Sequence, residues 1–402
     1  MGVLMLGAGL QGTLLGVRAT LEGFPPPVIG AVMSCYYVGY LVGTKVTPYF
    51  VGRVGHVRVF AAFTAVASVT ILLHAALVDP WFWGLMRLGS GLCFAGIYVV
   101  AESWLNGHTT RANRGSLLAV YMLILYIGLG VSQFLFMLAD ARTSSLFILA
   151  SVLISLAVVP MALTVQRTPQ IAVPRPVRYR DLYRNSPLGV VAVTVSGMVA
   201  AIVFSFGPVY ARLRGFGPQG VSMFMGVSIL AAVFTQLPIG RLSDRMDRRT
   251  VIGMVCLLGT MVAALIATMG EDMPRALFLA LSAVFGGLVL TLYSLAISHV
   301  NDQLEPEQMV DSSSALILLN GLGSVAGPLL MGSLIAAWGA GAYFATLAPL
   351  LGALTVYDIW RKIRRHAVAQ DHKGRFISAQ PQAITGQIVA AVGRERVDER
   401  PD

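Results

Sequence analysis

Charged residues are scarce in this sequence. Asp, Glu, Lys and Arg make up 12% of the 402 residues, whereas hydrophobic residues make up 56%. Soluble globular domains contain about 25% charged residues, so this composition excludes that class and predicts an integral membrane protein. The net charge of +10 would suggest a nucleic-acid partner in a soluble chain. Here we expect none, because the arginines gather on one side of the predicted membrane spans, where they set the topology.

Signals of cofactor chemistry are also lacking. Cys35, Cys93 and Cys256 stand singly in apolar runs, without the paired spacing of a metal site or a disulfide framework. The sequence contains no Gly-x-x-x-x-Gly-Lys-[Ser/Thr] element, which would cradle phosphates, and no nucleophile paired with a base in a local motif. We therefore expect no catalytic residue, no metal, no cofactor and no enzymatic activity.

Long apolar runs fill the chain instead. About 20 apolar residues cross the hydrocarbon core as a helix, and membrane helices tolerate interior Gly and Pro. The first run, 1–17, opens without the charged start and cleavage site of a signal peptide; either its helix continues to Glu22 or the natural start lies upstream. The fold class predicted is an all-α membrane protein with twelve transmembrane helices, at 2–22, 27–47, 58–78, 80–102, 115–138, 144–165, 188–211, 217–238, 250–269, 275–298, 312–336 and 340–360.

The distribution of positive charge predicts the orientation of these spans. Lysines and arginines near helix ends resist translocation, so they mark the cytoplasmic side. Loops on the side of Arg245 carry most of them, and the opposite loops and adjoining helix ends carry only Arg18, Arg142, Arg212, Arg214 and Arg275. An acidic loop at 301–311 is an exception that does not change the orientation, since acidic residues count little. Because the number of spans is even, both termini are expected in the cytoplasm, and the protein in the cytoplasmic (inner) membrane.

The chain divides into two similar halves. A segment rich in Pro and Arg, 166–187, is the one long interior connection, and the residues around Tyr98 and Gly91 recur around Tyr293 and Gly286 at an offset of 195. We expect an N-terminal six-helix bundle at 1–165, a cytoplasmic linker at 166–187, a C-terminal six-helix bundle at 188–361, and a cytoplasmic tail at 362–402. The start of this tail is basic and should meet anionic headgroups, and most of it should be disordered.

A dense cluster of charge separates two apolar runs at Gly240-Arg-Leu-Ser-Asp-Arg-Met-Asp-Arg-Arg249. It is expected to form a tight turn in water, with the Asp244 carboxylate capping the start of the next helix. The decapeptide resembles the loop signature Gly-x-Leu-x-Asp-Arg-x-Gly-Arg-Arg of the major facilitator superfamily. The fixed positions are held by Gly240, Leu242, Asp244, Arg245, Arg248 and Arg249, and Asp247 departs from the glycine that the family has.

Two further elements resemble the YcaD-like branch of that superfamily. They are Glu102-Ser-Trp-Leu-Asn106 at the end of the fourth helix and Arg53-Val-Gly-His-Val-Arg58 in the first loop. The first half lacks the signature aspartate, because Pro48 and Gly52 stand at the positions of the family's Gly and Asp. Glu102 could pair with loop arginines and latch the inner gate, or it could carry a proton. The resemblance implies two pseudo-symmetric six-helix bundles around a cavity that opens alternately to either side.

Two arginines lie in or near the predicted spans. Arg87 is one turn inside the fourth helix, where a charge is costly unless it faces a wet cavity or a partner. Its spacing to Gly91 resembles the family's fourth-helix motif, which implies a role in substrate or proton coupling; otherwise Arg87 snorkels to the outer headgroups. Arg18 and Glu22 are one helical turn apart and can pair, so Arg18 either faces an anionic substrate at the outer mouth or belongs to an interfacial ion pair.

Polar side chains inside the predicted spans are candidates for the lining of a cavity, since amide and phenol groups need partners in lipid. Each could instead be a link between helices. The eleventh helix also carries Gly327-Pro328, which resembles an antiporter motif but stands on a different helix from the family's fifth. The cavity candidates are Gln11, Tyr36, Tyr126, Gln133, Gln236, Tyr293 and Asn320.

Taken together, these features predict a secondary active transporter of a small organic solute that works by alternating access. One or two cavity arginines favour a neutral or anionic solute, and the family resemblance implies protons as the coupling ion. We expect a monomer in the lipid bilayer, in which Asp244 and neighbouring arginines stabilise the inward-closed state. Two alternatives stay open: export of amphipathic compounds, and a transporter-like receptor or scaffold that binds a ligand without moving it.

Overall fold

Long helices make up the computed structural model of this chain, which describes residues 1–107, 114–163, 179–304, 306–364, 376 and 378 and shows no strand among them. Within these residues, twelve helices are long and apolar enough to cross a membrane. The helices of the first half are α1 Gly2–Leu21, α2 Pro26–Val54, α3 His56–Ala76, α4 Pro80–Gly107, α5 Arg114–Leu135, η1 Phe136–Leu138, α6 Ser145–Leu156 and α7 Val158–Ala162. Those of the second are α8 Tyr179–Asn185, α9 Pro187–Leu213, α10 Pro218–Arg245, α11 Arg248–Met269, η2 Gly270–Asp272, α12 Arg275–Asn301, α13 Pro306–Trp338 and α14 Ala342–Arg364.

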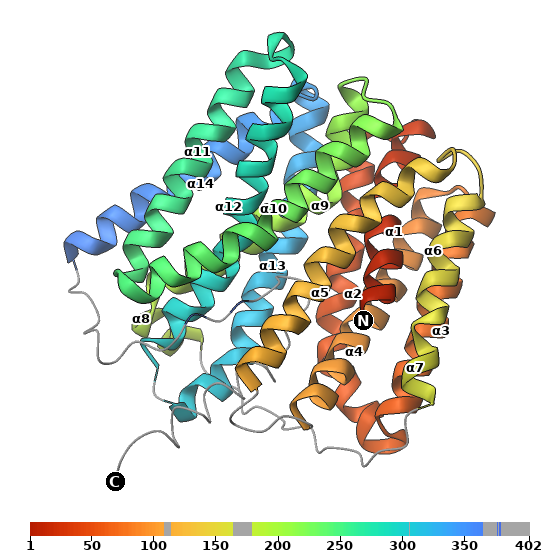
Figure 1. Ribbon diagram of the computed structural model, residues 1–402, viewed down its shortest axis with the longest axis horizontal. Coiled ribbons are helices and arrows are strands. Elements are labelled where there is room, and N and C mark those ends of the chain that lie inside the picture. Colours follow the sequence, from red (N-terminus) through yellow and green to blue (C-terminus); the bar gives the residue numbers. More distant parts are fainter. Residues whose placement is uncertain (108–113, 164–178, 305, 365–375, 377, 379–402) are drawn as a thin grey trace.

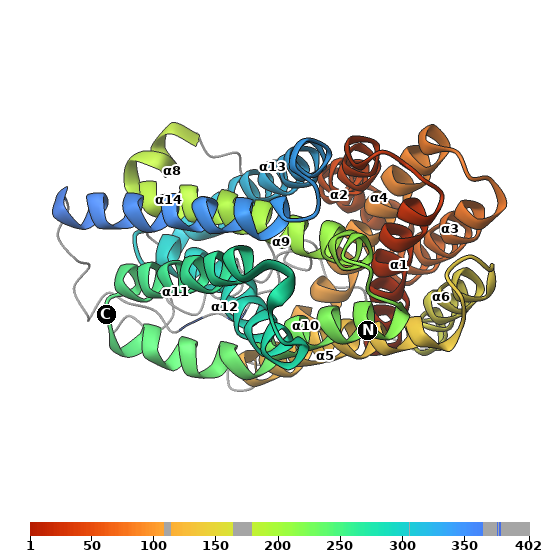
Figure 2. The same ribbon diagram turned by 90° about the horizontal axis from the view of Figure 1, so that it is seen from above.

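The two halves form two helical bundles side by side (Figures 1 and 2). In the first bundle α1 packs on α5 and α6, and α4 packs on α2 and α3. In the second bundle α12 packs on α10 and α11, and α9 packs on α13. The predicted fold class, an all-α membrane protein with twelve spans in two bundles, is confirmed.

Equivalent helix crossings repeat in the two bundles. Gly91 of α4 lies against the backbone of Tyr36 in α2, and Gly286 of α12 lies against the backbone of Ser228 in α10. A Cβ atom at either glycine would collide with the facing carbonyl, so each crossing requires glycine, as small residues at membrane helix contacts generally do. The two glycines are the pair that the sequence repeat aligned, and the residues they face are related by a similar offset.

Several helices are longer than predicted, because membrane helices continue past proline and beyond the apolar stretch. Helix α2 continues through Pro48 to Val54, and α4 continues past Glu102 to Gly107. The acidic segment 301–311 was predicted to be a loop, and this was wrong for most of its length: residues 302–304 lie between the helices, but α13 already begins at Pro306. The sixth span is divided at Ala157 into α6 and α7.

The predicted linker and tail fall mostly outside the described residues. Of the linker 166–187, the described part contains the short helix α8 and the start of α9, which the sequence had not indicated. Of the tail 362–402, α14 covers the first residues up to Arg364, and Phe376 and Ser378 are described further on. The predicted domain boundaries stay predictions.

Three helix pairs make the main contacts between the bundles, namely α2 with α13, α5 with α10, and α1 with α9. Their tight contacts include Gly30 on the Pro328 carbonyl, Gly16 beside Pro208, and Gly226 beside the Phe134 ring. We call the end of the molecule with the turn between α10 and α11 the turn end. Because Gly30 and Gly226 stand near the starts of α2 and α10, these contacts lie toward the opposite end.

Candidate functional site

The turn between α10 and α11 is shorter than predicted. Helix α10 continues to Arg245, so only Met246 and Asp247 lie between the two helices. Asp244 was expected to cap the next helix, and this was wrong. The cap is Asp247, which has extended backbone angles and accepts a hydrogen bond from the Arg249 amide at 3.1 Å. The residue that departs from the family signature therefore does the capping, because it directly precedes the first helical residue.

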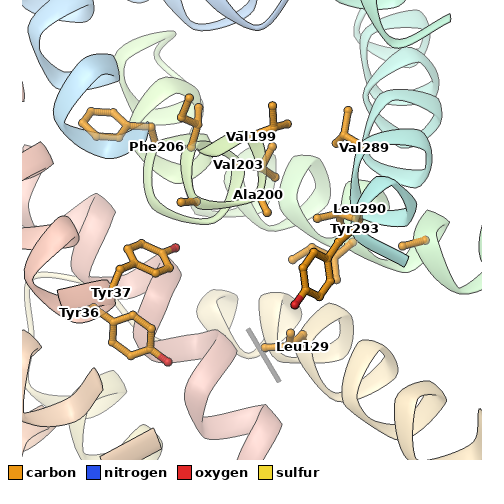
Figure 3. Packing of buried hydrophobic residues seen from close by; sticks show 14 of the residues in the cluster. Tyr36, Tyr37, Leu129, Val199, Ala200, Val203, Phe206, Val289, Leu290 and Tyr293 are labelled. Atoms are coloured by element: carbon orange, nitrogen blue, oxygen red, sulfur yellow. The ribbon is translucent and has the colours of Figure 1, made fainter. Parts of the chain in front are cut away.

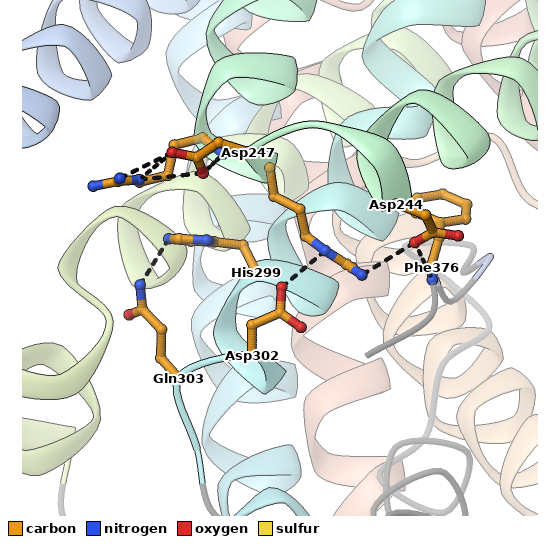
Figure 4. A network of polar contacts seen from close by, with 8 residues as sticks. Asp244, Asp247, His299, Asp302, Gln303 and Phe376 are labelled. Atoms are coloured by element: carbon orange, nitrogen blue, oxygen red, sulfur yellow. Dashed lines mark hydrogen bonds and ion pairs between the residues drawn. The ribbon is translucent and has the colours of Figure 1, made fainter. Parts of the chain in front are cut away.

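Arg248 is held between two carboxylates at the turn end (Figure 4). Its Nη2 lies 3.2 Å from Asp244 Oδ1 in α10, and its Nε lies 2.8 Å from Asp302 Oδ2 after the end of α12. The side chains of Arg248 and Asp302 are 1% and 3% exposed, whereas that of Asp244 is 40% exposed. The buried half of this network is thus the Arg248–Asp302 pair, which ties α11 to α12.

Arg249 forms a second ion pair with Asp247. Its Nε and Nη2 lie 3.2 and 2.9 Å from Asp247 Oδ2. Partial burial would raise the pKa of Asp247, but the hydrogen bonds and positive charge of Arg249 outweigh burial and lower it.

Nearby, His299 Nε2 lies 3.4 Å from Gln303 Nε2. Arg245, also part of the signature, is exposed at the end of α10.

The carboxylates of Asp244 and Asp302 both contact Arg248 but differ in burial. Their removal is therefore expected to cost different amounts of unfolding free energy. Removing one partner of a buried ion pair costs about 3–5 kcal/mol, and exposed pairs contribute about 0–1 kcal/mol. We therefore expect Asp302→Asn to lower the free energy of unfolding by several-fold more than Asp244→Asn. Unfolding by SDS in mixed micelles measures both, and equal losses in the two variants would contradict this assignment.

Asp247 makes stability depend on pH. Its pKa is lower in the folded protein than the value of about 3.9 in an unfolded chain. The stabilisation is therefore complete above the unfolded pKa and is lost as the pH falls through the folded pKa. We expect Asp247→Asn to lose less unfolding free energy between pH 5 and pH 3 than the wild type. The same pH dependence in both proteins would show that the ion pair with Arg249 contributes nothing.

Arg87 does not snorkel to the surface, since it is only 6% exposed. Its guanidinium lies over the ring of Tyr36 in α2, with Cζ 4.4 Å from the ring centroid. Among the described residues no carboxylate forms an ion pair with Arg87, and its Nε has no hydrogen-bond partner. A cation–π contact therefore carries the local stabilisation of a buried charge.

A row of aromatic rings connects Arg87 to the other end of α4. The ring of Tyr36 is 6.4 Å from that of Tyr40, and Tyr40 is 6.4 Å from Tyr98. Tyr36 and Tyr37 on α2 and Tyr293 on α12 point toward the region between the bundles (Figure 3). Arg87 and Glu102 stand fifteen residues apart on α4, which is about 22 Å along the helix, and the row of rings lies beside the stretch between them.

Glu102 lies at the turn-end side of this row and is fully buried. Its carboxylate is within electrostatic range of four phenols, those of Tyr40, Tyr98, Tyr121 and Tyr293. The hydroxyls of Tyr40 and Tyr121 are buried and have no hydrogen-bond partner among the described residues. The predicted pairing of Glu102 with loop arginines stays a prediction, because residues 108–113 lie outside the described part.

Two of the seven polar candidates are links between helices of the same bundle. Gln133 of α5 accepts a hydrogen bond from Thr13 of α1, and its amide donates to the Gly9 carbonyl at 3.4 Å. Asn320 of α13 donates to the Val193 carbonyl of α9 at 3.2 Å. Their polar groups stabilise helix packing, so neither is positioned primarily for a solute.

Three other polar candidates, Tyr126, Gln236 and Tyr293, lie at the junction of the bundles. Tyr126 of α5 donates to the Leu290 carbonyl of α12 at 3.2 Å, across the two halves, and also bonds with Gln236 of α10. Gln11 is 1% exposed, and its amide nitrogen has no partner among the described residues. Tyr293 is the member of the Glu102 cluster that comes from the second half.

Two arginines near the surface, Arg18 and Arg53, contact other residues of the protein. The predicted pairing of Arg18 with Glu22 is confirmed, with Nε 2.6 Å from Oε1. Arg18 also donates to the carbonyls of Ala141 and Arg142, so it joins the end of α1 to the loop before α6. Arg53 is exposed, with its Cζ 5.1 Å from the ring centroid of Tyr49.

Sequence reasoning missed Asp302 and three of the four phenols around Glu102, those of Tyr40, Tyr98 and Tyr121. Asp302 was counted only as part of an acidic loop, although a carboxylate directly after an apolar run could have indicated a partner for the signature arginines. The recurrence of Tyr at the four-residue spacing of Tyr36 and Tyr40 would have placed both on one helix face.

Within the described part of the chain, no three His, Cys, Asp or Glu residues are grouped to hold a metal ion.

Twelve spans in two repeated bundles, with a charged turn after the eighth span and a buried arginine and a buried carboxylate on the fourth, define a polytopic membrane transporter. The family model described as Major Facilitator Superfamily matches residues 1–309 and 215–390. The chain belongs to the major facilitator superfamily, as its loop signature predicted.

Curated relatives place the chain in the YcaD-like branch. The MFS-type transporter YcaD of Escherichia fergusonii is 30% identical over 331 residues, which cover 81% of this chain and 84% of the relative. YcaD of Salmonella arizonae is 28% identical with the same coverage. The resemblance carried by Glu102-Ser-Trp-Leu-Asn106 is thereby confirmed.

Solved structures show the same fold at low sequence identity. A mutant form of the nucleoside transporter NupG has a TM-score of 0.76 and 16% identity, covering 90% of this chain and 98% of that one. A bacterial homologue of the human lysosomal transporter Spinster, in an inward-facing and occupied conformation, has a TM-score of 0.69 and 14% identity, covering 92% and 96%. At these identities the likeness concerns the fold alone.

Proposed function

We propose that this protein is a secondary active transporter that moves a small neutral or anionic organic solute by alternating access, with protons as the coupling ion. It works as a monomer in the cytoplasmic membrane, with the turn end and both termini in the cytoplasm. The concentration of arginines at the turn end supports this orientation, because positive residues near helix ends stay in the cytoplasm.

The buried guanidinium of Arg87 is the observation that carries this proposal. A cation held inside a membrane protein without an ion pair among the described residues is costly, and such residues mark substrate or ion pathways. The face of Tyr36 stabilises the charge in the absence of solute. A carboxylate or another electron-rich group of the solute can then bind the guanidinium through two parallel hydrogen bonds.

Alternating access is supported by the uneven distribution of the contacts between the bundles along the length of the molecule. The glycine contacts at Gly30, Gly16 and Gly226 lie toward the end opposite the turn. Rocking of one bundle against the other around a central site would exchange these contacts for others at the turn end. The structure thus suits a state in which the opposite end is closed and the solute exchanges with the cytoplasm.

Proton coupling is supported by Glu102 and its phenols. Full burial disfavours the ionised form of a carboxyl group relative to its protonated form, and Glu102 is fully buried. The surrounding hydroxyls come from α2, α4 and α5 of the first half and from α12 of the second. Protonation of Glu102 would therefore change the interaction between the bundles, which is what coupling of a proton to rocking requires.

Proteoliposomes test this function. A thermal-shift screen of metabolites at two pH values identifies binding solutes, because a ligand raises stability by mass action. Each hit is then measured for uptake into proteoliposomes with an imposed proton gradient of either direction. We expect flux that follows the gradient. Saturable binding without flux for every hit would establish a receptor or scaffold instead, and flux only of amphipathic compounds outward would establish an exporter.

A further inference from the structure

The C-terminal segment touches α10 at three successive turns. The Phe376 amide donates to Asp244 Oδ1 at 2.8 Å, and Ser378 Oγ donates to Gln236 Oε1. The Phe376 ring lies on Gly240, so close that a Cβ atom at that position would collide with it. Figure 4 shows Phe376 beside Asp244 at the turn end. A residue more than 130 positions away in sequence therefore shares the carboxylate that also binds Arg248.

The three partners form one stripe on α10. Gln236, Gly240 and Asp244 are spaced by four residues, so they lie on one face of the helix, over a length of about 12 Å. The stripe offers an amide, a flat glycine surface and a carboxylate, in that order toward the turn end. The amide oxygen can accept a hydrogen bond from a hydroxyl side chain, the glycine can pack against an aromatic ring, and the carboxylate can accept a hydrogen bond from a backbone N–H of a peptide.

The stripe also belongs to the junction between the bundles. Gln236, which is 6% exposed, bonds both with Ser378 and with Tyr126 of α5 in the first half. Helices α5 and α10 pack on each other across the two bundles. A peptide on the stripe thus sits beside the surfaces that must approach when the turn end closes.

We infer that the stripe Gln236–Gly240–Asp244 is a binding site for the chain's own C-terminal segment, recognised as Phe-x-Ser, and that its occupation opposes closure of the turn end. A segment tethered to the same chain has an effective concentration in the millimolar range, so a few contacts suffice for reversible docking. When the segment leaves, Asp244 keeps its contact with Arg248 and Gln236 its contact with Tyr126, while both lose their contact with the segment. The bound segment slows the transport cycle and its release speeds it.

Cross-linking tests the docking without relying on transport. Gln236→Cys and Ser378→Cys are combined in the full-length chain in which Cys35, Cys93 and Cys256 are replaced. We expect a disulfide between positions 236 and 378 under mild oxidation, and at least 10-fold less of it when Phe376→Ala is added. Equal cross-linking with and without Phe376 would overturn the recognition.

A peptide supplies a second readout that is independent of flux. The variant Phe376→Ala leaves the stripe vacant, so a fluorescent peptide of residues 372–380 should bind it, and the same peptide with Ala for Phe should bind at least 10-fold more weakly. Gly240→Leu in that variant should abolish binding by occupying the place of the ring. Undiminished binding with either change would overturn the site.

Flux then tests the effect on the cycle. With a solute found by the screen, Phe376→Ala should raise the initial rate about two- to ten-fold over the wild type, and the unlabelled peptide should lower it again. Oxidation of the cross-linkable chain should stop flux, and reduction should restore it. Docking with unchanged flux would overturn the regulatory role. If no solute is transported, the proposed function fails, whereas cross-linking and peptide binding still decide the docking site.

Discussion

Replacing Arg87 with Gln is expected to weaken solute binding strongly and to impair transport. The guanidinium is buried, lies on Tyr36, and has no carboxylate partner among the described residues. Truncating one member of a buried, hydrogen-bonded charge pair typically costs about 2–5 kcal/mol, which is on the order of 100-fold in affinity. We therefore expect affinity for an anionic solute to fall by about that factor, as measured by isothermal titration of the purified protein.

Two variants separate the possible roles of Arg87. Arg87→Lys keeps the charge but lacks the planar fork, so it should recover only part of the affinity. Arg364→Gln is the matched control, because Arg364 is exposed and lies over Trp360 with its Cζ 4.5 Å from the ring centroid. We expect Arg364→Gln to bind the solute with the affinity of the wild type. Full affinity in Arg87→Gln would exclude Arg87 from the solute site and leave it a structural contact of Tyr36.

Replacing Glu102 with Gln is expected to abolish proton-driven accumulation while leaving exchange of solute intact. Gln resembles the protonated carboxyl in shape and lacks charge, so the bundles can rock without binding or releasing a proton. The phenols of Tyr40, Tyr98, Tyr121 and Tyr293 stay beside a polar group of similar shape. We expect uphill uptake in proteoliposomes to vanish, its pH dependence to flatten, and counterflow to stay within about three-fold of the wild type.

The matched control for Glu102 is Asp272→Asn, which removes a carboxylate from an exposed position at the end opposite the turn. It should accumulate solute like the wild type. Loss of both accumulation and counterflow in Glu102→Gln, with normal folding, would instead favour the alternative in which Glu102 latches the gate. Uphill uptake that survives in Glu102→Gln would exclude Glu102 as the coupling carboxylate.

The number of spans and their division into two bundles were predictable because lipid leaves few choices. Every backbone polar group in the hydrocarbon must be satisfied within a helix or a closed barrel, so apolar length alone indicates the spans. The repeat of Gly91 at Gly286 was readable for a related reason. A crossing that admits only glycine leaves the same residue in both halves, and the structure places both glycines on a facing backbone.

Helix ends and polar partners were less predictable. Proline at Pro48 and polar residues at Asp244 normally suggest that a helix ends, yet α2 and α10 continue through them. The Arg18–Glu22 pair was readable because its members are neighbours on one helix. The Arg248–Asp302 pair was not, since its members are 54 positions apart and meet only when α11 packs on α12.

The amino-acid sequence by itself determined that this protein is a twelve-span member of the major facilitator superfamily, because apolar length, arginine distribution and a local signature require no knowledge of packing. Only the tertiary structure decided which polar side chains link helices and which lie between the bundles. Gln133 and Gln236 look alike in sequence, but one bonds α1 to α5 and the other bonds α5 and the C-terminal segment. The physical reason is that a buried amide takes whichever partner the packed helices bring within about 3 Å.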